Sequence, residues 1–458
     1  MIDYWRVRSL LKNAWTLAIE TLSWMEMQRL SERLALARTV KQLGIGDADA
    51  IRFAHLLVCE TVRRQNFIDK FINIALKSRE IGEFSLGVQA FLRLYTYQTR
   101  LAKNWSTIDV KEAENIAKMA RSILGWKTLQ EVEPILGALL TQKPSIVLEK
   151  TGDEERIGLL AFHPIWFVKY CFNLFGRNET ITMLEADRQA PPTYVRLNTL
   201  KADENTILSK LEDEDIKVEK VEQLSYAYQV TKSRTTLAKT ASFREGLFYV
   251  QDKASCFAAE AANPKQGMTV LDVCAAPGAK TTYLAQLMRN QGSIYSIDYS
   301  RRRMNVWKSE IARMGVEIAE PLIADVRNLL PFSIEADLVV LDPSCTSTGT
   351  FGRLPSAKWR LTPRSIDRMA DVQTQMLDSC AGNAKAGGTL VYSTCSITVE
   401  ENEMQIERFL KRHPEFSLIE TTPKIGVPGL RGLDKCQRLY PHMHQCNGFF
   451  IAKLIKEG

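Results

Sequence analysis

The fold is decided by residues 269–282, which read Thr-Val-Leu-Asp-Val-Cys-Ala-Ala-Pro-Gly-Ala-Lys-Thr-Thr. A buried strand, a tight turn of small residues and the start of a helix follow one another without a gap. Backbone amides at such a helix start can face a ligand, and small side chains let the ligand approach closely. Both the Gly-x-x-x-x-Gly-Lys-Ser/Thr and the Gly-x-Gly-x-x-Gly spacings are absent. The stretch therefore predicts a ligand pocket that is not a phosphate-binding loop.

Strand and helix patterns alternate from about residue 267 onward, and this spacing predicts a doubly wound α/β sheet with helices on both faces. The expected strands are Met268–Val273, Ser293–Ile297, Glu317–Ile323, Ala336–Leu341, Thr389–Tyr392 and Gly448–Leu454. The expected helices are Thr281–Arg289, Arg301–Arg313, Ile366–Ala381 and Glu401–Arg412.

Acidic residues stand at the ends of the second and third expected strands, at Asp298 and Asp325. An acid about 20 residues past the first strand is placed to hold ribose hydroxyls. A carboxylate at the third strand end can accept a hydrogen bond from an adenine amino group. Together with the small-residue turn they suit an adenosyl ligand without a pyrophosphate, although strand-end acids can also be simple helix caps.

A thiol follows another expected strand, in the stretch Thr389–Ile397, which reads Thr-Leu-Val-Tyr-Ser-Thr-Cys-Ser-Ile. The strand ends in a small polar turn that carries Cys395, and an acidic helix start, Glu400–Glu403, comes next. A strand that ends in a cysteine-bearing loop can present a nucleophile at the carboxyl edge of a sheet. Taken alone, Cys395 could equally be a small core residue.

The rest of the chain divides by pattern. Residues 1–150 predict an all-helical domain, with apolar positions such as Val7, Leu11, Trp15 and Leu22 on one helical face and a break at Gly44–Asp47. Residues 151–190 predict a helical connector, and residues 191–262 a small α+β subdomain with strand, turn at Gly246 and strand over Phe243–Asp252. The small sheet could serve nucleic acid or only pack against the domain of residues 263–458.

Composition is that of a globular protein, with 45% hydrophobic and 25% charged residues, and the net charge of +7 fits a polyanionic partner. The nine cysteines have no paired spacing that suggests disulfides or a zinc site, so we expect a reducing cytoplasm and no bound metal. We expect no signal peptide, and no membrane span because His163-Pro164 and Lys169 interrupt the apolar run 157–175. We also expect a monomer.

The stretch Asp272–Thr281 resembles the Asp-x-Cys-Ala-Ala-Pro-Gly-Gly-Lys-Thr signature of the RNA 5-methylcytosine methyltransferases, the RsmB and Nol/Nop/Sun family. The resemblance extends over roughly residues 160–456, and residues 1–150 weakly resemble a NusB-type RNA-binding bundle. It continues through Gly246–Ser255, Asp298–Arg303, Asp342–Cys345, Ser393–Ser396 and Asn447–Phe450. Two positions depart from the family: Ala279 replaces a glycine, which is tolerable if its φ is negative, and Asn447 replaces a common Asp.

The resemblance implies a NusB-like bundle, an RRM-like α+β subdomain and a Rossmann-like domain that binds S-adenosylmethionine. The implied cofactor-binding residues are Cys274, Ala275, Ala276, Pro277, Gly278, Ala279, Lys280, Asp298, Arg303, Asp325 and Asp342.

The implied reaction is methylation of carbon 5 of cytosine. This carbon is a poor nucleophile, so a thiolate must first add to carbon 6. Family usage makes Cys395 that nucleophile and Cys345 the residue that assists release, whereas DNA methyltransferases use a cysteine in the position of Cys345. Asp342 can hydrogen-bond the base and stabilise the developing charge. Lys280 is expected near the base or the methionine carboxylate, or else is a solvated helix residue.

A basic surface should flank the pocket because the target base must be extruded or lie in a single-stranded loop. Candidates, each of which could also be ordinary solvated charge, are Arg301, Arg302, Arg303, Arg353, Lys358, Arg360, Arg364 and Arg368, with Trp359 as a stacking face.

The helical start favours ribosomal RNA as the substrate. Alternatives are a transfer-RNA enzyme and a catalytically idle RNA-binding assembly factor, and the absence of a target-recognition insert disfavours DNA.

Overall fold

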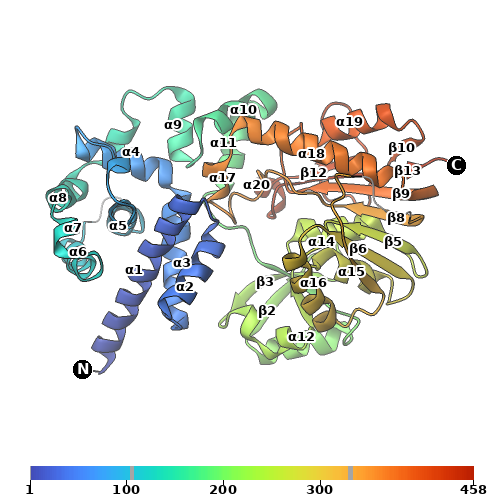
Figure 1. The fold of residues 1–458 in the computed structure, drawn as a ribbon, viewed down its shortest axis with the longest axis horizontal. Coiled ribbons are helices and arrows are strands. Elements are labelled where there is room, and N and C mark those ends of the chain that lie inside the picture. Colours follow the sequence, from blue (N-terminus) through green and yellow to red (C-terminus); the bar gives the residue numbers. More distant parts are fainter. Residues whose placement is uncertain (1, 104–107, 329–333) are drawn as a thin grey trace. The chain divides into compact units, whose positions relative to one another are not determined.

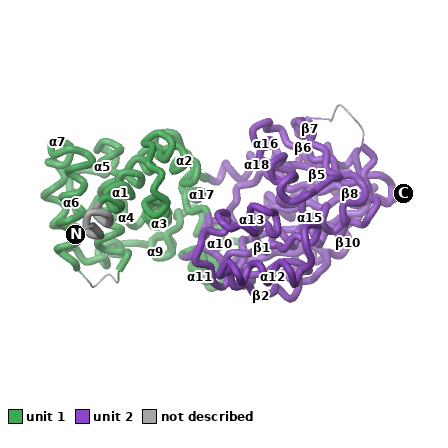
Figure 2. The backbone as a smooth tube through the Cα atoms, turned by 90° about the horizontal axis from the view of Figure 1, so that it is seen from below, with its two compact units in different colours: residues 1–188, 354–361 green, residues 189–353, 362–458 purple. Residues whose placement is uncertain are grey.

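The computed structural model describes residues 2–103, 108–328 and 334–458. The chain forms two compact units (Figure 2). The helical unit comprises residues 1–188 and 354–361. The second unit comprises residues 189–353 and 362–458 and is called the catalytic unit because it contains the catalytic residues that the resemblance implies. The second unit contains both sheets of the molecule's described part. Residues 354–361 lie between its two stretches of sequence but belong to the helical unit.

The helical unit confirms the all-helical expectation for the described part of residues 1–150. Its α-helices are α1 (Ile2–Gln28), α2 (Glu32–Leu43), α3 (Ala48–Arg63), α4 (Gln65–Leu76), α5 (Leu86–Thr96), α6 (Val110–Leu124), α7 (Trp126–Leu129), α8 (Glu133–Thr141), α9 (Asp153–Leu160), α10 (Ile165–Phe175) and α11 (Arg177–Ala186). Short helical turns of other types are η1 (Ile81–Glu83), η2 (Tyr97–Leu101) and η3 (Pro144–Leu148).

Packing in this unit follows the apolar pattern with one exception. Trp15 and Leu22 of α1 are buried in a core shared with α3, α4 and α5, as the pattern predicts. Leu11 was expected on the same face but is exposed, so the apolar stripe does not extend to it. Asp47 caps α3 by accepting hydrogen bonds from the amides of Asp49 and Ala50, which fixes the break after Gly44.

The segment 354–361, which contains the short helix α17 (Ala357–Arg360), packs into the helical unit. The indole Nε1 of Trp359 donates to the carbonyl of Val62 at 2.6 Å, and Ser356 donates to Glu32. Lys358 is only 1% exposed. The expectation that Lys358 flanks an RNA surface is therefore wrong, because its side chain is buried in the helical unit, whereas stacking of RNA on the partly buried Trp359 stays a prediction.

Among the described residues, no single helix has the length and apolar character needed to cross a membrane. The apolar run 157–175 is divided between α9 and α10, which meet at an angle of 107°.

The smaller sheet lies in the catalytic unit and is entirely antiparallel, with the order β2-β3-β1-β4. Its elements are β1 (Tyr194–Leu197), α12 (Glu204–Asp213), β2 (Ile216–Lys220), β3 (Ala227–Ser233), η4 (Leu237–Lys239), α13 (Ala241–Arg244) and β4 (Phe248–Val250). The prediction of a strand that begins at Phe243 is wrong, because Phe243 lies in α13, which Thr240 caps through the Phe243 amide. Gly246 then turns the chain at φ 78°.

The larger sheet confirms the doubly wound expectation. Within the described residues its order is β11-β12-β13-β9-β8-β5-β6-β7, with β10 beside β13, and the five strands from β9 to β7 are parallel (Figure 1). The strands are β5 (Thr269–Val273), β6 (Ser293–Asp298), β7 (Ala319–Ile323), β8 (Ala336–Leu341), β9 (Ala384–Thr394), β10 (Phe416–Ile419), β11 (Val427–Pro428), β12 (Gln437–Leu439) and β13 (Phe449–Lys456).

Helices cover both faces of this sheet (Figure 1). They are α14 (Lys253–Ala262), α15 (Ala279–Leu287), α16 (Arg301–Met314), α18 (Pro363–Ala381) and α19 (Glu403–Arg412), and the short helix α20 (Pro441–His444) follows β12. Alternate residues of β8 enter different cores: Leu338 and Val340 pack with α14 to α16, whereas Val339 and Leu341 pack with α18 and α19. The carboxyl ends of β5, β6, β8 and β9 therefore meet at one edge, where the sequence places its candidate site residues.

Candidate active site

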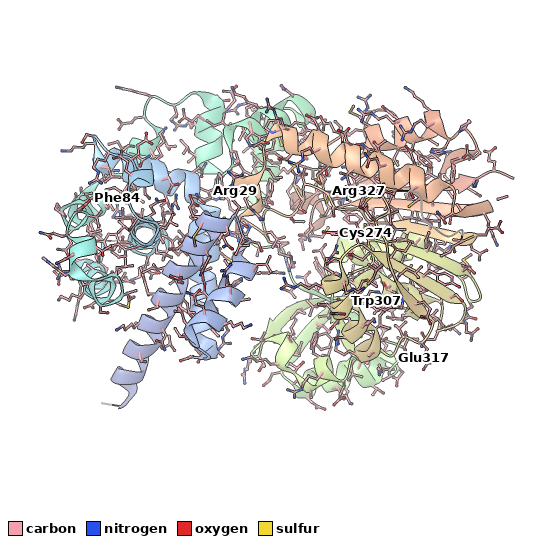
Figure 3. The ribbon with its side chains drawn as sticks, viewed as in Figure 1. Arg29, Phe84, Cys274, Trp307, Glu317 and Arg327 are labelled. Atoms are coloured by element: carbon pink, nitrogen blue, oxygen red, sulfur yellow. The ribbon has the colours of Figure 1, made fainter. Side chains whose placement is uncertain are left out.

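The small-residue loop connects β5 to α15, as the sequence predicts. Cys274 and Gly278 have positive φ angles of 65° and 110°. Beneath the loop, Thr281 donates to the buried carboxyl of Asp272 at 2.5 Å and accepts from Trp307 of α16 at 3.0 Å. Burial raises the pKa of Asp272 to about 7. Figure 3 labels Cys274 at the loop and Trp307 on its helix.

Two positions at the end of this loop explain its composition. A Cβ at residue 278 would lie 3.3 Å from Trp307 Cδ1 and would also meet an unfavourable backbone angle, so glycine fits there. Ala279 is the first residue of α15, and its backbone is not in the positive-φ region. Alanine in place of the family's glycine therefore causes no strain at this position.

The second strand end brings Asp298 beside the loop. Arg303 lies 3.0 Å from Asp298 Oδ2 and also donates to the carbonyl of Ala276. Among the described residues, Asp298 Oδ2 has this ion pair but no hydrogen bond of good geometry, although the side chain is buried. A buried acceptor at a strand end beside a loop of Ala275, Ala276 and Pro277 fits a ribose diol, so the residues present suit an adenosyl cofactor.

Asp325, at the third strand end, is engaged by its own neighbour. Arg327 forms hydrogen bonds with both carboxylate oxygens at 2.5 to 3.0 Å, and these bonds lower the pKa of Asp325. The side chain is one third exposed. Contact with an adenine stays a prediction for this residue.

Lys280 and Asp342 form an ion pair at the centre of the site. Asp342 directly follows β8, and Lys280 lies in the first turn of α15; their Nζ and Oδ2 atoms are 2.5 Å apart. Burial lowers the pKa of Lys280, but the adjacent carboxylate outweighs it and the net shift is upward. Lys280 is therefore a charged residue of the site rather than a solvated helix residue.

The two thiols expected in the site touch each other. Cys345 Sγ lies 3.2 Å from Cys395 Sγ, although 50 residues separate them in the sequence. The Ser347 hydroxyl lies 3.5 Å from Cys395 Sγ and 3.9 Å from Cys345 Sγ. Their loops are joined by a hydrogen bond from the Gly349 amide to the Cys395 carbonyl at 3.0 Å.

The environment makes the two thiols unequal. Hydrogen bonding with Cys345 lowers the pKa of Cys395; the Ser347 hydroxyl and the positive charge of Lys280 act in the same direction, against burial. The same contact and burial raise the pKa of Cys345 well above its usual range. Of the two thiols, Cys395 is therefore the one that loses its proton more readily.

Sequence reasoning assigned no function to Glu401, which the structure places between the two thiol-bearing loops. Its carboxylate accepts hydrogen bonds from the Thr346 amide and from the Ser396 hydroxyl, and the side chain is fully buried. The available signal was the acidic run Glu400–Glu403 immediately after the cysteine loop, which reads equally well as a helix start.

Some of the expected basic residues are accessible in the catalytic unit. Arg301 and Arg302 on α16, and Arg364 and Arg368 on α18, are exposed. Arg353 is partly buried and donates to the Pro192 carbonyl at 2.9 Å.

A doubly wound sheet with an adenosyl-type loop, a charged Lys-Asp pair and two touching thiols at its carboxyl edge defines an S-adenosylmethionine-dependent methyltransferase. Two family models match the chain. One, described as 16S rRNA methyltransferase RsmB/F, matches residues 259–455, and the other, described as an RsmF/B-like ferredoxin-like domain, matches residues 163–236.

Two curated relatives extend these matches. The probable ribosomal RNA small subunit methyltransferase B of Bacillus subtilis is 31% identical over 456 residues, covering 96% of this chain and 98% of that protein. The tRNA (cytosine(72)-C(5))-methyltransferase of Pyrococcus horikoshii is 37% identical over 221 residues, covering 48% of this chain and 55% of that protein.

Two solved structures are also similar. The crystal structure of PH0851 has a TM-score of 0.83 at 30% identity and covers 97% of this chain and 99% of that chain. NSun6 from Pyrococcus horikoshii, solved with the S-adenosylmethionine analogue SFG, has a TM-score of 0.61 at 27% identity and covers 64% and 98% of the two chains. The chain belongs to the RsmB/F family, and it is an S-adenosylmethionine-dependent RNA (cytosine-C5)-methyltransferase.

Proposed function

We propose that the chain methylates carbon 5 of cytosine in ribosomal RNA through a covalent adduct between Cys395 and carbon 6 of the base. The observation that supports this mechanism best is the 3.2 Å contact between Cys345 and Cys395 beside the Lys280-Asp342 pair. One thiol adds to the base and the other is close enough to act on the adduct.

Each residue then has a separate task. The Cys395 thiolate adds to carbon 6, which gives carbon 5 the electron density to accept a methyl group. The Asp342 carboxylate accepts a hydrogen bond from the amino group of the base, and from N3 when that nitrogen carries a proton, and Lys280 holds the carboxylate in place. When bound, S-adenosylmethionine supplies an electrophilic methyl group. The carbon 5 proton then passes to solvent, the electrons of that bond restore the ring, and the carbon 6–sulfur bond breaks to expel Cys395 as a thiolate, with Cys345 assisting release.

We assign the cofactor to the loop Cys274–Gly278 and the start of α15. Small side chains and the buried Asp298 carboxylate support this assignment. Ala279, Lys280, Arg303 and Asp342 border the same loop, whereas Asp325 would have to exchange its contacts with Arg327 to reach an adenine.

Deleting each thiol separately tests the mechanism. Cys395→Ala should abolish transfer of a labelled methyl group to RNA, because it removes the thiol that is proposed to add to carbon 6. Cys345→Ala should instead accumulate an RNA-protein adduct that survives denaturing electrophoresis. Cys59→Ala, which removes a partly buried thiol from the helical unit, is the matched control and should behave as the wild type. An adduct in Cys395→Ala and none in Cys345→Ala would contradict the assignment.

Ribosomal RNA is the proposed substrate because the Bacillus subtilis relative matches nearly the whole chain, helical unit included. We propose that this unit, as a NusB-like bundle, and the RRM-like small sheet contribute RNA contacts. Mapping 5-methylcytosine in total RNA from cells that lack the chain tests the substrate. One missing ribosomal site supports the proposal, whereas a missing transfer-RNA site would favour the Pyrococcus-type activity. An unchanged map together with no methyl transfer in vitro would favour an idle assembly factor.

We further propose that the protein acts in the cytoplasm as a monomer. The nine cysteines are all free, which suits a reducing compartment. Light scattering measures the mass of the purified protein in solution, and the mass of a dimer would contradict the proposed monomer.

A further inference from the structure

Glu401 lies between the two loops that carry the thiols, on a segment to which the proposed mechanism gives no task. Its side chain is fully buried, and it precedes the first residue of α19 by two positions. A buried carboxylate is costly unless donors surround it, so the number and origin of its donors indicate what it holds together.

On the Cys345 side, the carboxylate is bonded to the residue that directly follows the thiol. The Thr346 amide donates to Glu401 Oε1 at 2.8 Å, and the Thr346 hydroxyl donates to Oε2. Gln373 of α18 donates to Oε1 at 2.9 Å and also to the Ser344 carbonyl at 3.0 Å. The residues on both sides of Cys345 are thereby tied to one carboxylate.

On the Cys395 side, the same carboxylate binds the residue that directly follows the other thiol. The Ser396 hydroxyl lies 2.7 Å from Glu401 Oε2 and the Thr398 hydroxyl lies 2.9 Å from it. Thr348, from the Cys345 loop, contacts the Ser396 hydroxyl at 2.8 Å. Glu401 Oε2 is therefore the shared acceptor of both loops.

The neighbours of Glu401 fix the Cys395 loop to the sheet and to α19. Asn402 accepts from the Thr394 hydroxyl at 2.6 Å and donates to the Ser396 carbonyl at 2.9 Å. Arg438 of β12 pairs with Glu403 and donates to the Ile397 carbonyl at 2.9 Å. Glu401, Asn402 and Glu403 thus hold the Cys395 loop, directly or through Arg438. Of these three residues, only Glu401 also bonds the Cys345 loop.

We propose that Glu401 is a positioning residue that sets the separation between the Cys345 and Cys395 sulfur atoms. The inference rests on the proposed covalent mechanism, because the separation matters only if one thiol acts on the adduct of the other. A shift of about 1 Å between reacting groups can cost about 10²-fold in rate. Loosening the loops should therefore slow release of the adduct more than binding of RNA or cofactor.

Two substitutions test the length and the charge of the Glu401 side chain separately. Glu401→Asp keeps a carboxylate but withdraws it by one methylene, so the carboxylate can no longer reach both loops. Glu401→Gln keeps the length, and two of the three hydroxyl groups can reverse to accept from its amide, which has two N–H donors. We expect kcat to fall roughly 10- to 100-fold for Glu401→Asp and clearly less for Glu401→Gln. KM for RNA should stay near the wild-type value in both.

The second readout is the covalent adduct. Glu401→Asp should raise the fraction of enzyme held as an RNA adduct at steady state, because release depends on Cys345. In a Cys345→Ala background the same change should add little, since residues that act through one another are not additive. Glu407→Gln is the matched control on α19, because Glu407 pairs with Arg431.

Four outcomes decide the inference. Wild-type kcat in Glu401→Asp overturns it, as does a loss of kcat that follows a loss of folded protein in circular dichroism without more adduct. If Cys345→Ala accumulates adduct while Glu401→Asp does not, the mechanism stands and only the positioning role fails. If Cys395→Ala still methylates RNA, the proposed mechanism itself fails.

Discussion

Lys280 of the catalytic unit, whose side chain is 11% exposed, and Lys358 of the helical unit, which is 1% exposed, differ in their partners. In the catalytic unit, Lys280 donates to the Asp342 carboxylate at 2.5 Å. In the helical unit, Lys358 is 1% exposed, and its Nζ atom makes no hydrogen bond within the described part of the chain. The ammonium group of Lys358 lies 5.1 Å from the centre of the Trp359 ring.

The different partners lead to opposite pKa shifts. Burial lowers the pKa of both side chains, since it disfavours the charged form. The adjacent carboxylate reverses that effect for Lys280, whose net shift is upward. For Lys358 the effect of burial prevails: Asp187 opposes it, Arg63 and Arg64 reinforce it, and the pKa is about 7. The difference teaches that a bonded carboxylate can outweigh the effect of burial and let an enclosed lysine keep its charge.

The largest effect is expected at Lys280. Lys280→Met removes the positive charge beside Asp342 and Cys395, so both the orientation of the carboxylate and the stabilisation of the thiolate are lost. Loss of one preorganised electrostatic group costs about 10²–10³-fold in rate. Single-turnover transfer of a labelled methyl group measures this change.

Lys385→Met is the matched control, because Lys385 pairs with Asp337 in the same unit but outside the site. It should retain activity within a few-fold of the wild type. If Lys280→Met and Lys385→Met lose activity equally, the pair beside the thiols has no special function and the comparison between the two buried lysines is broken.

The contrast between the lysines also shows what the sequence could predict. Lys280 belongs to a continuous strand, turn and helix, whose geometry is set within a few residues, so its place at the site could be predicted. The burial of Lys358 depends on its segment packing in the helical unit, where the Trp359 indole bonds Val62 across 297 residues. Local charge patterning cannot report such a contact.

The site around the two thiols likewise has features that the sequence could predict and features that it could not. The strand-end position of Cys395 follows from the alternation of elements, and the identity of Asp342 and Cys345 as site residues follows from the family signature. The bonds from Thr346 and Ser396 to Glu401 connect positions 55 and 5 residues away from that carboxylate. An acid at a helix start and an acid that joins two loops have the same local sequence, so only the fold distinguishes them.

The next effect concerns stability. Lys358→Met replaces an ammonium that lacks a hydrogen-bond partner in the described structure by an apolar chain of similar length. A buried charge without a hydrogen-bond partner costs free energy that an apolar side chain does not. We expect Lys358→Met to raise the free energy of urea unfolding at pH 7 and to leave methyl transfer unchanged. A destabilised variant would show that the lysine has a structural partner after all.

The same variant should change the pH dependence of stability. The folded-state pKa of Lys358 is about 7, below the unfolded value of roughly 10.4. Between these two pH values the unfolded chain binds the extra proton, so this group makes the free energy of unfolding rise with pH. The stabilising effect of Lys358→Met should therefore be largest below pH 7 and should shrink as the pH approaches 10. A difference that does not depend on pH would contradict the assigned pKa.

The smallest effect extends the comparison from lysines to thiols. Cys380 is buried in the core between the sheet and α18, and burial raises its pKa. The contact with Cys345 instead lowers the pKa of Cys395. Again the bonded partner decides the shift. Cys345→Ala removes that partner, so the pKa of Cys395 should rise and less thiolate should be present at neutral pH.

Alkylation by iodoacetamide followed by mass spectrometry of the Cys395 peptide measures this shift directly. In Cys345→Ala we expect several-fold slower alkylation at pH 7 and a pH midpoint displaced upward. The Cys59→Ala variant should leave the midpoint in place, because Cys59 lies in the other unit. An unchanged midpoint in Cys345→Ala would mean that Lys280 and Ser347 suffice to lower the pKa of Cys395, and that Cys345 acts on the adduct without first preparing the nucleophile.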